Sequence, residues 1–322
     1  MQHRHTPYHF NLIFSNLLFG INFSVFVSLI QTGMAFQQIF MLQIAASALF
    51  FIPRALFSPR SYRIAPRDML TIFAVTVLIV YGWMFMLLWG ASYTNPIDAS
   101  TIATLGPAIT LVAANIGGRE KNLSGFRMIG ILFAAAGAAL LIFDHGSDII
   151  HGSEAYGNIL ILLSVTAAAV NTVIIKPVLE RYGTMPVMGW YYMIGLAITA
   201  PFFRHHINTS ELLQLPIEAL SELGYLLLLG TVLPSYLLYR ATEKLTYVHT
   251  ALYRYLQPLA TTVLALLRGQ ERIDRTNVIA AALIFIGIVM VVTGYELVRH
   301  RVNSLTAKLK NRRMRSRRTK PR

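Results

Sequence analysis

The chain has 322 residues, 55% of them hydrophobic and only 13% charged, and none of them is cysteine. The charged share is about half of that in soluble globular proteins, which excludes a water-soluble domain, and the lack of cysteine excludes disulfide scaffolds, thiolate metal sites and cysteine nucleophiles. The formal net charge of +14 does not indicate nucleic-acid binding, because residues 299–322 carry 11 of the 28 Lys and Arg residues and leave the rest of the chain nearly balanced.

Apolar runs recur along the whole chain, and each approaches the ~20 residues that a helix needs to cross the ~30 Å hydrocarbon core of a membrane. They lie at approximately residues 10–30, 36–57, 68–90, 97–117, 124–143, 156–176, 186–203, 218–240, 247–267 and 277–297. Strands of a membrane β-barrel would alternate between polar and apolar residues, whereas these runs are apolar on every side. We therefore predict an all-α polytopic membrane protein with ten transmembrane helices.

Basic residues in the connections predict the orientation, because Lys and Arg are retained on the cytoplasmic side of a membrane. The loops after the second, fourth, sixth and eighth runs are basic, whereas those after the first, third and fifth contain neither Lys nor Arg. Both termini are therefore predicted to lie in the cytoplasm, with the chain in the cell (inner) membrane. The loop after the ninth run departs from the pattern, since it carries Arg268, Arg272 and Arg275 on the predicted outer side.

The sequence also repeats itself. Pro107 in the fourth run precedes Glu120 by thirteen residues, and Pro258 in the ninth run precedes Glu271 by the same interval. Two units of five spans follow, and because five is odd the second unit must be inverted, as in many secondary transporters. The equivalent turns then face opposite sides, which explains the exceptional basic loop. The predicted segments are a cytoplasmic N-terminus (1–9), two inverted five-helix repeats (10–147 and 154–297) and a basic cytoplasmic tail (299–322).

Several short motifs mark the second unit. They are Leu228 to Thr231, Tyr236 to Tyr239, Ala251 to Pro258, Gly269 to Glu271 and Ala281 to Gly287. These motifs resemble the EamA repeat of the drug/metabolite transporter (DMT) superfamily, and the first unit is similar through Phe19 to Phe23, Pro107 and Glu120. The chain departs from the family where Phe19 replaces a usual tryptophan and Gln43 a frequent arginine. The resemblance implies ten helices and the export or exchange of small metabolites, such as amino acids, without ATP.

Arg254 is the leading candidate for solute binding, because a charged side chain inside a span is costly in hydrocarbon. Its guanidinium could bind a carboxylate or phosphate, or its stem could extend to the headgroups. His249, Tyr253 and Gln257 recur every four residues in the same predicted helix and form one polar stripe. We expect this stripe to face a cavity, and hydrogen bonding between helices is the alternative.

Further polar side chains lie well inside predicted spans. Asn22 and Asn171 occupy roughly equivalent places in the two units, so we expect them at a midplane site, although such groups also form bonds between helices. Tyr236 is a further candidate, and Tyr81 either lines the cavity or packs against neighbouring helices. The cluster Trp190 to Tyr192 stands near the end of a span and is typical of an interfacial aromatic belt.

Other residues have predicted structural roles. Pro107 and Pro258 interrupt helical hydrogen bonding and predict bends, whereas Glu120 and Glu271 begin the following helices, where a carboxylate complements the helix dipole. No acidic residue lies near the middle of a predicted span, so we expect facilitated diffusion, or coupling through His249, and not a buried carboxylate. The chain has no nucleotide-binding, zinc-protease or serine-hydrolase motif, and we expect no cofactor, metal or catalytic residue.

The sequence therefore predicts a transporter or facilitator that exports a small polar or amphipathic solute by alternating access. The expected partners are this solute and anionic lipid headgroups at the basic tail, with no nucleic acid; assembly into a homo-oligomer is left open. The alternative is a membrane-embedded enzyme acting on a lipid or isoprenoid headgroup, which would use the cluster of Asp144, His145, Asp148 and His151. A scaffold without transport would explain the tail but not the paired polar positions.

Overall fold

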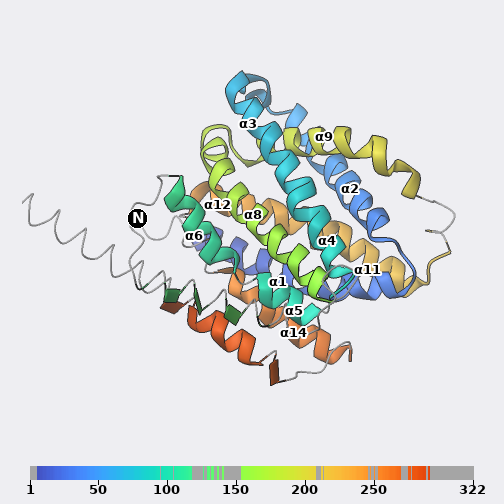
Figure 1. Cartoon of the computed structure of the whole chain (residues 1–322). Coiled ribbons are helices and arrows are strands. Elements are labelled where there is room, and N and C mark those ends of the chain that lie inside the picture. The colour runs from blue at the N-terminus through green and yellow to red at the C-terminus, as the bar shows by residue number, and fades with distance from the viewer. Residues whose placement is uncertain are drawn as a thin grey trace, which may run out of the picture.

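The computed structural model is built from helices, and it contains no strand in the part of the chain that it describes. The described residues are 6–94, 96–103, 105–117, 126, 129–130, 132–133, 136–137, 140, 154–207, 212, 214–245, 247, 250, 253–269, 275–276, 278–287 and 289–290. Figure 1 shows these helices gathered into one bundle. An all-helical polytopic architecture is therefore confirmed.

The helices follow the apolar runs closely. Those before residue 120 are α1 (Thr6–Gln31), α2 (Phe36–Leu56), α3 (Pro66–Val77), α4 (Met86–Ala91), α5 (Pro96–Ala103) and α6 (Gly106–Ile116), with the 3-10 helix η2 (Pro59–Arg63) and the π-helical segment η3 (Leu78–Phe85). Those after residue 150 are α8 (Glu154–Tyr182), α9 (Thr184–Phe203), α11 (Ile217–Leu227), α12 (Leu233–Lys244) and α14 (Leu256–Leu267), with the 3-10 helices η4 (Arg204–His206) and η6 (Tyr253–Tyr255) and the π-helical segment η5 (Leu228–Val232).

Six helical stretches in the described part are long and apolar enough to cross a membrane. They are Thr6–Gln31, Phe36–Leu56, Pro66–Ala91, Glu154–Tyr182, Thr184–His206 and Ile217–Lys244, and they match the first, second, third, sixth, seventh and eighth predicted spans. Two shorter apolar helices, Thr101–Ile116 and Val278–Gly287, fall within the fourth and tenth. The chain is therefore a multi-pass membrane protein. The full count of ten helices stays a prediction, because the remaining spans lie partly outside the described residues.

One helix from each half of the chain packs against helices of the other half. The helix α1 packs against α12 and α14, and its counterpart α8 packs against α4, η3 and α6. The helices α2 and α9 pack on one another along most of their lengths. The two halves are therefore interleaved, and the space between them is enclosed by helices from both.

The helix ends that the charge pattern predicts to be cytoplasmic lie together. Tyr182, the last residue of α8, donates a hydrogen bond from Oη to Asp68 Oδ2 at the start of α3 (2.7 Å). Thr184, which begins α9, donates from Oγ1 to Glu243 Oε2 near the end of α12 (2.7 Å). These links tie four helix ends to each other at one face of the bundle. Which side of the membrane that face occupies stays a prediction.

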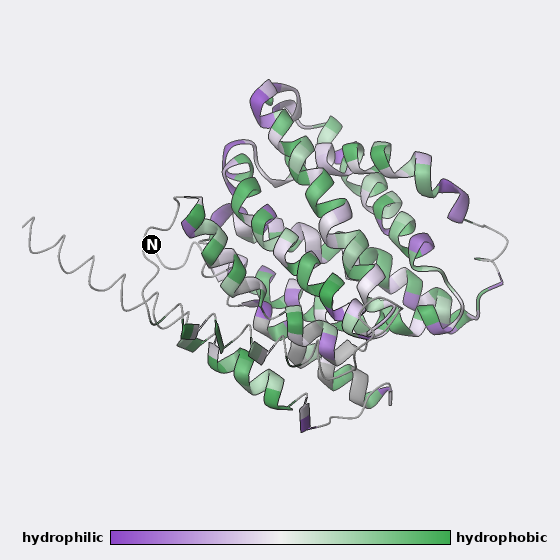
Figure 2. Ribbon diagram, in the orientation of Figure 1, coloured by the Kyte–Doolittle hydropathy of each residue, from purple (hydrophilic) through white to green (hydrophobic). Residues whose placement is uncertain are grey.

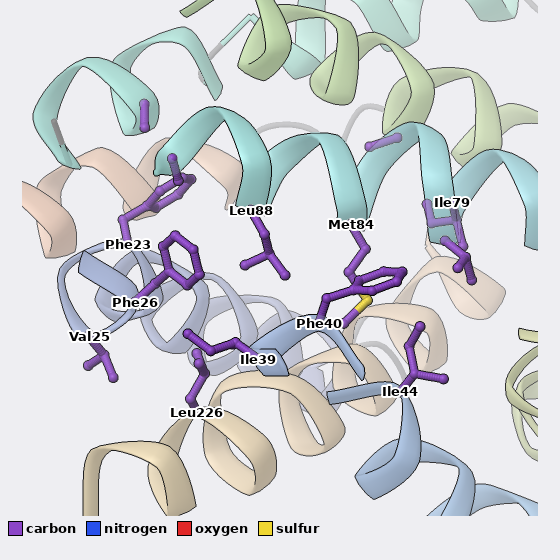
Figure 3. Close-up of a cluster of buried hydrophobic side chains, with 14 of the residues drawn as sticks. Phe23, Val25, Phe26, Ile39, Phe40, Ile44, Ile79, Met84, Leu88 and Leu226 are labelled. Atoms are coloured by element: carbon purple, nitrogen blue, oxygen red, sulfur yellow. The ribbon is translucent and has the colours of Figure 1, made fainter. Parts of the chain in front are cut away.

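Apolar residues are both the core of the bundle and its outer surface. Phe40 and Phe51 are fully buried, whereas Leu49 is 78% exposed on the outside of α2, as expected for a side chain that contacts lipid. Figure 2 shows apolar residues over the helix faces and hydrophilic residues mainly at the turns and helix ends. Within the core, Met84 and Leu88 extend from the η3 to α4 helix toward Phe40 and the α1 side chains (Figure 3).

Candidate functional site

A cavity of about 130 Å³ lies inside the bundle, between the two halves of the chain. Its polar lining residues are Asn22, Gln43, Asn171, Thr172, Thr231, Ser235, Tyr239, Thr242, Arg254 and Gln257. The rest of the lining is apolar or aromatic and includes Phe19, Trp83, Tyr191 and Tyr192. Four of the residues that the sequence singled out as candidates therefore line this cavity, namely Asn22, Asn171, Arg254 and Gln257.

Arg254 brings a positive charge to the cavity. It belongs to the 3-10 helix η6, and its Nη2 lies 3.5 Å from Thr172 Oγ1 on α8. Gly106 makes room for the guanidinium, since a Cβ at that position would lie 3.0 Å from Arg254 Nη1. None of the ion pairs between described residues involves Arg254. Its half-buried charge therefore lacks a carboxylate partner in this part of the chain, which leaves it suited to an anionic group of a solute.

Asn171 lies on α8 in the same lining. Its Nδ2 donates a hydrogen bond to Tyr239 Oη on α12 (3.2 Å), while its Oδ1 is buried and has no partner among the described residues. A buried amide oxygen without a donor is costly, so a donor on a bound solute would be stabilised there. Asn171 thus contributes a hydrogen-bond acceptor to the cavity lining, and Arg254 contributes donors to the same lining.

Asn22, on α1, supports an irregular part of the opposite helix. Pro234 has no backbone N–H, so the carbonyl of Gly230, four residues earlier, lacks its usual helical donor. The side-chain amide of Asn22 supplies a donor to this carbonyl. The Oδ1 atom of Asn22 is buried and has no hydrogen-bond partner within the described part of the chain. Asn22 therefore stabilises η5, and its Oδ1 also lies close to Gly230.

Gln43, on α2, completes the set of amide side chains. Its Nε2 donates to Thr231 Oγ1 in η5 (2.8 Å), and its Oε1 is buried without a partner in the described structure. Gln257, on α14, is instead engaged with α1, because its Nε2 donates to Asn16 Oδ1 (2.7 Å). Three residues that line the cavity, Asn22, Gln43 and Asn171, thus each have a buried amide oxygen without a hydrogen-bond partner among the described residues.

Two π-helical segments border the cavity, one in each half of the chain. Ile79, Trp83 and Met84 line it from η3, and Gly230 and Thr231 line it from η5. A π-helical segment widens the turn and redirects the side chains that follow it, and such segments are frequently found at functional sites. Both segments lie near the middle of their spans, the third and the eighth, which are equivalent in the predicted repeat.

Tyr191 and Tyr192 do not belong to an aromatic belt at the membrane surface, so that prediction is wrong for these two residues. Each is only 5% exposed, and both line the cavity from α9. The turn before α9 is short, so these side chains lie two turns into the helix and face inward. Trp190, on a different face, donates from Nε1 to Ser61 O (2.9 Å) at the end of the bundle.

Three candidate tyrosines are not among the residues that line this cavity. Tyr81 donates from Oη to Ile198 O (3.0 Å) and joins the third span to α9. Tyr236 lines a second pocket nearer the end of the bundle. The hydroxyl oxygen of Tyr253 lies 3.0 Å from Nδ1 of His9, which is near the start of α1. Tyr253 and Gln257 therefore contact different parts of α1, because a 3-10 turn separates Tyr253 from the regular helix α14.

Several predicted residues lie outside the described part of the chain. These are His249, Glu120, Glu271, the cluster Asp144, His145, Asp148 and His151, and the basic tail 299–322. The prolines are placed by the backbone alone. Pro107 is the second residue of α6, and Pro258 is the third residue of α14. Both prolines thus stand in the first turn of a helix, where a missing N–H is tolerated.

Two buried acidic residues lie at helix ends. Asp98, in the first turn of α5, is fully buried and accepts a bond from Asn158 Nδ2 (3.4 Å). Glu243 is 8% exposed near the end of α12. Among the described residues, no three His, Cys, Asp or Glu side chains are grouped closely enough to hold a metal ion.

Comparison with known proteins finds a family that is similar to the second half of the chain. Residues 155–293 match the EamA-like transporter family. This region therefore resembles that family. The matched region of the EamA-like chain contains α8, the helix that brings Asn171 to the cavity, together with η5 and Arg254. It therefore includes the cavity side chains that the second half contributes.

Two relatives of this EamA-like chain carry transporter names. The Uncharacterized transporter YetK of Bacillus subtilis (strain 168) is 22% identical over 70% of this chain and 68% of its own length. An Uncharacterized transporter of Archaeoglobus fulgidus is 22% identical over 80% of this chain and 86% of its own length. A solved crystal structure covers 90% of this chain and 98% of its own, with a TM-score of 0.55 and 16% identity, so the likeness concerns the fold alone. Membrane transport is thus the general activity.

Proposed function

We propose that this EamA-like protein is a secondary transporter or facilitator that exports a small zwitterionic, amino acid-like solute across the inner membrane. In this proposal two inverted five-helix repeats, with both termini in the cytoplasm, rock around the cavity, and no ATP is used. The basic tail 299–322 contacts anionic headgroups beside the inner surface.

The pairing of charge and acceptors in the cavity carries the proposal. Arg254 can bind a carboxylate through two parallel hydrogen bonds, and this geometry suits a guanidinium better than any other side chain. The free oxygens of Asn171 and Gln43 can accept hydrogen bonds from an ammonium group. Apolar and aromatic walls would hold the remaining, less polar part of such a solute. A solute with both charges satisfies more of these groups than a simple anion or amine.

The size of the cavity favours a solute of few atoms. Its volume of about 130 Å³ is close to the ~150 Å³ of an engineered cavity that holds one benzene molecule. A solute near this size can be enclosed by the helices of both halves. A nucleotide or a lipid exceeds this volume, so the size of the cavity favours amino acid-like molecules.

Contacts between the halves support alternating access. In this proposal each half, together with the helix that it receives from the other (α1 or α8), moves as one body around the cavity. At the predicted inner end, Asp68 of the first half bonds Arg181 and Tyr182 of the second. These bonds would have to break for the cavity to open at that end, and they are few enough to be exchanged during a cycle.

Counterflow in proteoliposomes tests the solute class. We expect exchange of alanine or valine to exceed that of ethylamine or isobutylamine, the same molecules without the carboxylate, by roughly 10- to 150-fold, because a bond to a charged group contributes about 1.5–3 kcal/mol. Arg254→Gln should remove this preference. The control is Arg268→Gln, which removes an arginine that pairs with Glu222 and does not line the cavity.

Two results would contradict the proposal. One is equal exchange of the amino acid and its amine by the unchanged protein. The other is an Arg254→Gln variant that folds, transports and keeps the full preference for the carboxylate, since the cation would then have no part in recognition.

A further inference from the structure

A second pocket, of about 430 Å³, lies at the end of the bundle where α2 leads into α3. Its walls come from η2, from the turn between α8 and α9, and from α12. Three arginines line it: Arg60 and Arg63 from η2, and Arg240 from α12. This pocket is separate from the central cavity, with which it shares no lining residue.

The pocket has an excess of positive charge. Neither Arg60 nor Arg63 takes part in an ion pair with another described residue. Arg240 pairs with Glu243 at 3.2 Å, but Lys244 pairs with the same carboxylate at 2.7 Å, so two cations share one anion. Both η2 arginines are exposed, and Arg60 Nη1 would lie 3.8 Å from a Cβ on Gly183. An anion in the pocket would therefore meet uncompensated guanidinium groups.

The surface beside the pocket is apolar. Leu56 and Phe57, where α2 ends, are 53% and 89% exposed, and Tyr62 within η2 is 67% exposed. Because α2 spans the membrane and ends at Leu56, these side chains lie at the level where acyl chains meet headgroups. A soluble anion would use only the arginines. A molecule with a phosphate and acyl chains would use both the arginines and this apolar surface.

We propose that the Arg60, Arg63 and Arg240 pocket binds the phosphate of an anionic membrane phospholipid, with the acyl chains lying along the C-terminal part of α2. Basic pockets between transmembrane helices at the membrane surface bind such headgroups, and arginine pairs with phosphate through two hydrogen bonds. The lipid would contact η2, the start of α9 and α12 at once and would add to the direct contacts between these elements.

Native mass spectrometry of the full-length protein in detergent tests this proposal. Phosphatidylglycerol and phosphatidylcholine with identical acyl chains are titrated into the unchanged protein, which should bind phosphatidylglycerol more tightly. Each basic residue near an anionic surface contributes about fivefold, so Arg60→Gln with Arg63→Gln should weaken phosphatidylglycerol binding roughly 25-fold. Binding of phosphatidylcholine should change little.

A matched control removes the same charge from the same end of the protein. Arg54→Gln with Arg67→Gln changes two arginines that do not line the pocket and should keep most of the phosphatidylglycerol affinity. The basic tail is present in every variant and therefore contributes equally. A third variant, Arg60→Lys with Arg63→Lys, keeps the charge and should recover part of the binding if the pocket variant is correctly folded.

Three outcomes would overturn the proposal. Equal losses in the pocket variant and the control would mean that general surface charge, and not this pocket, attracts the lipid. Binding of glycerol 1-phosphate as tight as that of phosphatidylglycerol would identify the ligand as a soluble anion. Equal affinity for the two phospholipids would exclude recognition of net charge. Lipid binding is measured without a transported solute, so the result does not depend on the proposed transport activity.

Discussion

The close contact between Gly230 and Asn22 allows the cost of a substitution at position 230 to be calculated. A Cβ at position 230 would lie 2.4 Å from Asn22 Oδ1, well inside the ordinary contact distance. In Gly230→Ala the Asn22 amide must therefore move, which costs about 1–3 kcal/mol for the carbonyl that loses its donor. Overpacking of the neighbouring side chains adds about 1–3 kcal/mol. We expect Gly230→Ala to lower the free energy of unfolding by about 2–6 kcal/mol in total.

A second substitution separates the two costs. Asn22→Ala alone removes the donor but leaves no steric conflict, so it should cost about 1–3 kcal/mol. Once Asn22 is alanine, the Gly230→Ala methyl group no longer meets the amide, and the double variant should be close to Asn22→Ala. The two substitutions should therefore be non-additive, with a coupling energy about as large as the whole cost of Gly230→Ala, roughly 2–6 kcal/mol.

Unfolding by sodium dodecyl sulfate from detergent micelles, followed by tryptophan fluorescence, measures all four proteins of this cycle. Trp83 lines the cavity and reports on the region concerned. Destabilisation that adds simply, with a double variant as unstable as the sum of the single changes, would refute the reasoning. It would mean that Gly230 is required for its backbone conformation and not for the space that Asn22 occupies.

Three further substitutions test the packing and the end of the bundle. Gly20→Ala places a Cβ 2.4 Å from the backbone oxygen of Gln257, so thermal unfolding should show a loss of about 1–3 kcal/mol or more, and an unchanged midpoint would contradict this close approach of α1 and α14. Gly224→Ala, where no atom lies within 4 Å, is the matched control and should stabilise α11 by up to about 1 kcal/mol. Glu243→Gln weakens the contact with Thr184 and removes a charge that two cations share. The melting temperature should therefore fall, most clearly at low salt. A difference from the unchanged protein that is the same at all salt concentrations would argue against an ionic role.

The sequence predicted the features that depend on composition. Apolar runs predict helical spans, because a segment in lipid must form all its backbone hydrogen bonds internally. The six long helices follow these runs. Asn22, Asn171 and Arg254 were recognisable as candidates for a similar reason, since a polar group inside a span is costly unless it has a partner or a cavity. Each of these three side chains lines the central cavity.

Other parts of the site depend on the direction of side chains, which composition does not determine. Gln43 stood out only as a departure from the family pattern, although its free Oε1 is buried beside η5. Tyr191 and Tyr192 were assigned to the membrane surface because they stand near the end of an apolar run. The signal that could have corrected this was the polar character of the neighbouring spans, which need buried hydroxyl groups as partners.

The residues that line the central cavity include neither Tyr81 nor Tyr236, and the cause is geometric for both. A helical wheel with 3.6 residues per turn assigns Tyr81 and Tyr236 to a face, but both spans contain a π-helical segment that shifts this assignment. Nothing in the apolar composition of residues 78–85 marks the change of pitch. For η5, Pro234 was visible in the sequence and could have indicated an irregular helix.

Each π-helical segment holds an extra residue in its wide turn. The segment therefore sets the direction in which the side chains after it face, relative to those before it. An α-helix turns by about 100° for each residue, so deleting one residue from η3 would rotate all of α4 by roughly that angle relative to α3. Leu87, Leu88 and Ala91 would then leave the cavity, although every side chain in the span would still be apolar. Insertions and deletions in the third and eighth spans are therefore expected to be far less tolerable than substitutions, even where hydropathy is unchanged.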